Sequence, residues 1–97
     1  MRVTAAADAV GFIRAHGGQL FVWPVEHRSA RLTIALLEAS VDPPPGTLDF
    51  RRVEAWDFLL FLHPALKTLP DELLVMLRGR RRPRIAAYWD GLAYIVA

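Results

Sequence analysis

The densest group of side chains suited to chemistry is a cluster of arginines close to residue 80. Five of the 12 lysines and arginines fall between positions 78 and 84, namely Arg78, Arg80, Arg81, Arg82 and Arg84. Guanidinium groups present forked donors that match phosphate and carboxylate oxygens. The rest of the chain has seven basic residues against ten acidic ones, so the excess positive charge is confined to this segment. The cluster predicts a solvated turn that keeps a sheet edge soluble, with an anion-binding hairpin as the alternative.

The other chemically capable residue types do not form a recognisable site. The sequence has no cysteine, which excludes thiolate catalysis and cysteine-ligated zinc or iron–sulfur sites. His16, His27 and His63 form no pair four residues apart, and no carboxylate accompanies them at a metal-site spacing. Neither Ser29 nor Ser40 lies in a Gly-x-Ser-x-Gly elbow. We therefore expect a protein that is not an enzyme and that has no cofactor and no metal site.

Three tryptophans are candidates for stacking against a partner. Trp23 and Trp89 lie in short runs with strand character, where aromatic residues are usually core. Trp56 lies in an expected turn, so it is the tryptophan that we expect to face outward.

Length and composition indicate one globular domain spanning residues 1–97. The chain is 54% hydrophobic and 23% charged, which is typical of a folded protein and not of a disordered one. No apolar run approaches the roughly 18 residues of a membrane span. The first residues carry one positive charge but no long apolar stretch, so we expect no signal peptide and a cytoplasmic location.

Residues 58–62, with the sequence Phe-Leu-Leu-Phe-Leu, predict a central strand that ends at His63 and Pro64. Five consecutive large apolar side chains require cover on both faces, and we expect Phe61 in the core. Towards the N-terminus, apolar residues at helical spacing after Thr4 predict a helix over 4–15. A short strand over 19–23 should follow and end at Pro24, with a polar loop over 24–31.

The remaining elements are expected as follows. A strand over 32–38 precedes a stiff connector over 42–46, which holds three consecutive prolines. Alternation over 48–54 predicts a hairpin into the central strand. Residues 73–78 satisfy both helix and strand patterns, whereas 84–89 favour a strand. Asp90 and Gly91 then form a hairpin-type turn into 92–96.

This order of elements resembles the HesB/IscA family of iron–sulfur assembly proteins. The resemblance spans nearly the whole chain and rests on Glu38, on the connector Val41-Asp42-Pro43-Pro44-Pro45 and on the strand that ends at His63. It implies an α+β, mainly β fold, with an N-terminal helix packed on a small mixed β-sandwich. It also implies that residues 73–78 are a strand.

The sequence departs from the family at its ligands. Members carry a cysteine in the loop between the first two strands and a Cys-x-Cys pair near the C-terminus, whereas this chain has none. His27, Ser29 and Arg31 occupy the loop, which makes it a vestigial ligand loop, and His27 is the candidate there for any residual metal binding.

The resemblance implies a non-catalytic, cluster-free relative that acts by protein–protein contact. The expected partner is a protein, with a homodimer through residues 92–96 as one form, and their packing on the chain's own sandwich as the other interpretation. The alternative function is binding of nucleic acid or an anionic surface through residues 78–84.

Overall fold

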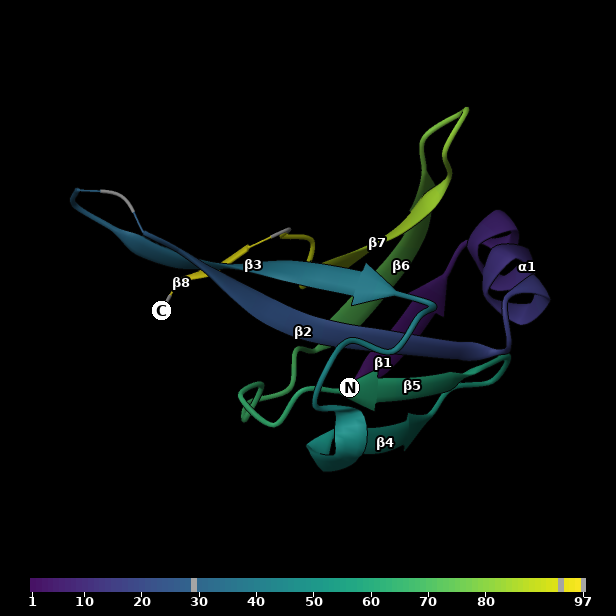
Figure 1. Ribbon diagram of the computed structural model, residues 1–97, viewed down its shortest axis with the longest axis horizontal. Coiled ribbons are helices and arrows are strands. Elements are labelled where there is room, and N and C mark those ends of the chain that lie inside the picture. The colour runs from purple at the N-terminus through teal and green to yellow at the C-terminus, as the bar shows by residue number, and fades with distance from the viewer. Residues whose placement is uncertain (29, 93, 97) are drawn as a thin grey trace.

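The computed structural model describes residues 1–28, 30–92 and 94–96, which form two mixed sheets and one α-helix, α1 (Ala7–Ala15) (Figure 1). The first sheet has the order β1-β6-β7, with the strands β1 (Arg2–Ala5), β6 (Glu72–Arg78) and β7 (Arg84–Trp89). The second has the order β4-β5-β2-β3-β8, with the strands β4 (Arg51–Glu54), β5 (Leu59–Leu62), β2 (Gln19–Arg28), β3 (Thr33–Ser40) and β8 (Tyr94–Val96). This confirms the mainly β fold with one helix.

Both sheets and the helix contribute to a shared core. Leu20 and Val22 of β2, together with Leu73 and Val75 of β6, are fully buried. The helix adds Ile13, which is also fully buried and whose carbonyl accepts a hydrogen bond from Gly18 N–H at 2.9 Å. That bond closes the C-terminal end of α1 with Gly18 at φ 76°, a conformation that glycine adopts freely.

The central strand is confirmed, but one of its residues lies on the other face. β5 pairs with β4 on one side and β2 on the other. Leu60 and Leu62 are fully buried, whereas Leu59 and Phe61 are half-buried. The expectation that Phe61 lies in the core was wrong, because side chains alternate along a strand. Phe61 instead stacks on Phe21 on the outer face, with 5.0 Å between ring centroids.

The expected helix over 4–15 was wrong at its start, because residues 2–5 form strand β1. This strand pairs in parallel with β6, and Arg2 N–H donates to Asp71 O at 2.9 Å. The Thr4 hydroxyl is not a helix cap and donates to Glu72 Oε2 at 3.0 Å. The helix begins only at Ala7. A strand partner so far along the chain leaves no local signal in the sequence.

The expected loop over 24–31 was also wrong, because β2 continues through Pro24 to Arg28. The amide and carbonyl of a strand residue point to the same side, and every second residue repeats that direction. The Val22 carbonyl accepts a bond from His63 N–H on the β5 side, so Pro24 faces that side too. There β5 has already ended at Leu62, so the missing N–H of proline breaks no ladder bond. His27 therefore lies on a strand, opposite Ile34, and not in a loop.

The C-terminal half follows the expectations more closely. The strand β6, which the resemblance implied, is confirmed, and it pairs with β7 as an antiparallel hairpin. Asp90 and Gly91 form a turn with φ 50° and 84°, bracketed by hydrogen bonds in both directions between Trp89 and Leu92. The chain then crosses to the other sheet, where β8 pairs with β3. This is the packing interpretation of residues 92–96; residues 93 and 97 lie outside the described part.

Strand β4 starts later than the alternation suggested. A 3₁₀ helix, Thr47–Asp49, follows the proline-rich connector, and the strand begins at Arg51. The hairpin between β4 and β5 is confirmed. Within the described residues, no helix is long and apolar enough to cross a membrane.

Candidate functional site

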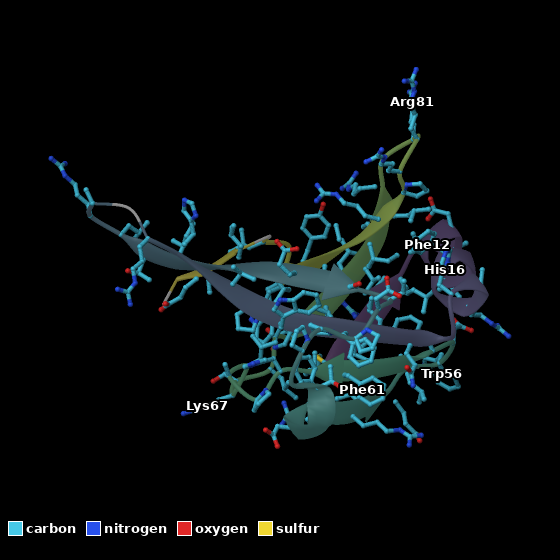
Figure 2. All side chains as sticks on the ribbon, viewed as in Figure 1. Phe12, His16, Trp56, Phe61, Lys67 and Arg81 are labelled. Atoms are coloured by element: carbon cyan, nitrogen blue, oxygen red, sulfur yellow. The ribbon has the colours of Figure 1, made fainter. Side chains whose placement is uncertain are left out.

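The five arginines of the cluster lie on the β6–β7 hairpin, which projects from the sandwich (Figure 1). Arg78 ends β6 directly opposite Arg84, which begins β7. Arg80, Arg81 and Arg82 form the tip, where Figure 2 places Arg81 farthest from the body of the protein. All five are exposed. The hairpin predicted for this segment is therefore confirmed, and its arginines are exposed.

Glycine is required at the start of the tip. Gly79 has φ 90°, and a Cβ atom there would lie 2.7 Å from the Arg82 carbonyl oxygen. Both the backbone conformation and the close approach exclude a larger residue without movement. The tight turn holds the arginines of the tip close together.

Arg78 is oriented by a neighbour across the hairpin. Its Nε donates to the Tyr88 hydroxyl at 3.0 Å, and its Cζ lies 5.6 Å from the Tyr88 ring centroid. A guanidinium has five N–H donors, so this bond leaves the two terminal amino groups of Arg78 for another acceptor. Within the described part of the chain, none of the five arginines lies in an ion pair.

A groove of about 390 Å³ opens at the base of this hairpin, between β3 and β7. Arg78, Arg84 and Tyr88 line one side of it, and residues 36–39 line the other. Glu38, the acidic residue of this lining, is exposed. The groove thus places two guanidinium groups opposite one carboxylate, and the rest of its lining is apolar apart from the Tyr88 hydroxyl.

The vestigial ligand loop brings no group of three metal ligands together among its described residues. His27 is exposed on β2, Arg31 is exposed in the turn that follows, and Ser29 lies outside the described part. No three histidine, aspartate or glutamate side chains gather closely enough to hold a metal ion among the residues described.

The other two histidines have local partners. His16 Nδ1 donates to the Phe12 carbonyl at 2.7 Å, and its ring stacks on Phe12 with 4.1 Å between centroids. His63 accepts a hydrogen bond from Ala65 N–H at 2.9 Å and meets the Phe50 ring edge to face. These contacts explain both residues as parts of the fold, as the sequence suggested.

The sequence predicted only part of a second exposed surface, around Trp56. Trp56, in the turn between β4 and β5, is 99% exposed, which confirms that it faces outward. Trp89 packs against the core as expected, and Trp23 is half-buried. What the sequence did not reveal is that the turn 55–58 and strand β1 line a common groove of about 370 Å³. The sequence contains no signal for this groove, since its pattern places residues 4–5 in a helix and residues 2–3 in no element.

Comparison with known proteins supports the architecture. No family model and no curated protein sequence matches this chain. Among solved structures, the crystal structure of IscA with the [2Fe–2S] cluster is similar, with a TM-score of 0.54 over 98% of each chain at 11% identity. The chain has the IscA-like fold. At this identity the likeness concerns the fold alone, so descent from the family stays a prediction.

The residues present do not fit the cluster that this structural neighbour holds. Iron–sulfur clusters are bound mainly by cysteine thiolates, and this sequence contains no cysteine. The IscA-like fold is thus present without the donor atoms for a cluster.

Proposed function

We propose that this chain is a non-catalytic, cluster-free protein of the IscA-like fold that acts in the cytoplasm by contact with another protein. The observation that carries the proposal is Trp56, which is 99% exposed beside an open sheet edge. Burying an indole removes a large apolar surface from water, and tryptophan is enriched among the residues that dominate binding energy at interfaces. Figure 2 shows Trp56 at the periphery of the sandwich.

The open edge belongs to β1, the outermost strand of its sheet. Arg2 N–H bonds to Asp71 O and Ala6 N–H bonds to Val75 O, so the even-numbered residues point towards β6. Val3 and Ala5 consequently direct their N–H and C=O groups away from β6, towards the groove beside Trp56. An extended segment can add to such an edge as a further strand.

The charges around Trp56 favour a basic side chain in that segment. Asp57 lines the groove and forms no ion pair with another described residue. Arg2 also lines it, but its charge is offset by Glu72 Oε2 at 3.0 Å. A lysine or arginine over the indole face would gain a cation–π contact next to the Asp57 carboxylate. The proposed partner is therefore a protein with an exposed, extended, basic segment.

The test uses a displayed library of random linear peptides. We expect selection on the purified protein to enrich peptides that carry lysine or arginine among β-branched residues. Trp56→Ala should weaken binding of the selected peptides about tenfold or more, as measured by calorimetry. Leu92→Ala is the matched control, because Leu92 is also exposed, at 52%, but lies away from this groove.

A second variant tests the strand edge itself. Ala5→Pro removes an N–H that points away from β6, so the ladder between β1 and β6 stays while the edge loses a donor. Equal binding by wild type, Trp56→Ala and Ala5→Pro would refute this surface, and absence of any enriched peptide would refute the proposed partner class. Thermal unfolding of each variant checks that the fold is retained.

A further inference from the structure

We propose that Arg78 and Arg84 clamp a backbone phosphate of single-stranded nucleic acid, with the adjoining nucleoside in the groove between β3 and β7. This goes beyond the protein-contact role, which rests on a different surface. The first support is position: the two arginines are directly paired across the hairpin and line the same groove of about 390 Å³. That volume lies in the range of small-ligand sites, roughly 300–1,000 Å³.

The second support is preorganisation. The Tyr88 hydroxyl accepts a hydrogen bond from Arg78 Nε at 3.0 Å, which orients the guanidinium before a ligand arrives. The two terminal amino groups remain as a parallel pair of donors, the geometry that suits two oxygens of one phosphate. Arg84, in register with Arg78, supplies a second fork to the same region.

The third support is uncompensated charge. Residues 78–84 hold five arginines and no acid, and none of these arginines is in an ion pair with a described residue. The guanidinium groups extend from the groove to the hairpin tip, where Figure 2 places Arg81. A line of charges matches a ligand with repeated phosphates, so Arg80, Arg81 and Arg82 would meet phosphates that follow the clamped one.

Glu38 limits where each part of the ligand can lie. Its carboxylate is on the β3 side of the groove and repels a phosphate, so the phosphate must lie on the arginine side. The nucleoside then lies towards β3, where the Glu38 carboxylate can accept a hydrogen bond from an exocyclic amino group of the base. The apolar lining includes two small side chains, Ala39 and Ala86, against which a flat ring can lie.

Single-stranded nucleic acid suits this hairpin better than a membrane surface. Peripheral membrane binding needs apolar side chains to enter the acyl region, and the tip between Gly79 and Pro83 holds only arginines. A base can enter the groove only when it is not stacked in a duplex, which favours a single strand.

Fluorescence anisotropy with a labelled single-stranded oligonucleotide of mixed sequence tests the proposal. We expect binding whose logarithmic affinity falls linearly with the logarithm of salt concentration, by about 0.7 per phosphate neutralised. The double variant Arg78→Gln/Arg84→Gln should bind at least about tenfold more weakly. The charge-matched control Arg14→Gln/Arg51→Gln removes two exposed arginines that do not line the groove and should change affinity by less than about threefold.

Two further variants separate a clamp from a simple charge effect. Arg78→Lys keeps the charge but loses the fork, and Tyr88→Phe removes the hydroxyl that orients Arg78; both should weaken binding several-fold at unchanged net charge. Equal losses in the clamp variant and its charge-matched control would overturn the clamp. Binding to phosphatidylserine vesicles but not to the oligonucleotide, or to neither, would overturn nucleic acid as the ligand. Any of these results leaves the Trp56 peptide assay unaffected, so the two proposals fail independently.

Discussion

Replacing Leu60 by alanine should destabilise this protein far more than the same replacement at the adjacent Leu59. Leu60 is fully buried between the sheets, and its neighbour across the pair with β2, Leu20, is fully buried as well. Removing a buried leucine side chain costs about 2–5 kcal/mol, because the lost transfer free energy is joined by that of the cavity. Leu59 is half-buried on the opposite face, so its truncation should cost about 1 kcal/mol.

The pair is well matched because both substitutions are Leu→Ala in one strand, β5, and lose the same strand propensity. At about 4–8 °C per kcal/mol for a domain of this size, Leu60→Ala should lower Tm by roughly 8–40 °C and Leu59→Ala by about 4–8 °C. Thermal unfolding followed by circular dichroism gives both values, and urea unfolding checks that the slope m is unchanged. Equal losses, or a larger loss for Leu59→Ala, would show that the buried face of β5 is assigned wrongly.

Three further expectations concern the hairpin turn, iron–sulfur cluster binding and self-association. Gly79→Ala should cost about 1–3 kcal/mol, because φ is 90° and the Cβ would approach the Arg82 carbonyl. Gly11→Ala, in helix α1 with nothing near the new Cβ, should stabilise the protein by about 1 kcal/mol. A lower free energy of unfolding in urea for Gly11→Ala than for Gly79→Ala would contradict both assignments. Iron–sulfur reconstitution should leave a colourless protein after desalting, since no thiolate is present, and retained visible absorbance would refute this. We propose a homodimer through the outer edge of β8, the last strand of its sheet. Light scattering should give twice 10.9 kDa for the chain and half that mass after deletion of residues 94–97, and a monomeric full chain would exclude the dimer.

Local sequence determined the elements whose signals lie within a few residues. The apolar run 58–62 predicted the central strand, and the pair Asp90 and Gly91 predicted a turn that needs two residues with positive φ. The arginines of 78–84 predicted an exposed hairpin, because five like charges cannot be buried together. The absence of cysteine also decided, without any structure, that no thiolate-held cluster can form.

Where local signals conflicted, the resemblance to the HesB/IscA family decided. Residues 71–78 have two acids first and arginine last, as a helix would, yet residues 72–78 form β6 between β1 and β7. Burial of Leu73 and Val75 on one face of a sheet outweighs the intrinsic preference for helix.

Only the tertiary structure decided what depends on distant partners. Residues 2–5 are a strand because β6 lies beside them, and Pro24 is tolerated inside β2 because the pairing with β5 ends two residues earlier, at Val22. The pairing of β1 with β6 places β1 at the groove beside Trp56, and the pairing of β6 with β7 brings Tyr88 to Arg78. No spacing in the sequence predicts either arrangement. The physical reason is that strand pairing is satisfied by hydrogen bonds between segments far apart in the chain, whereas turns, charge clusters and apolar runs are properties of neighbouring residues.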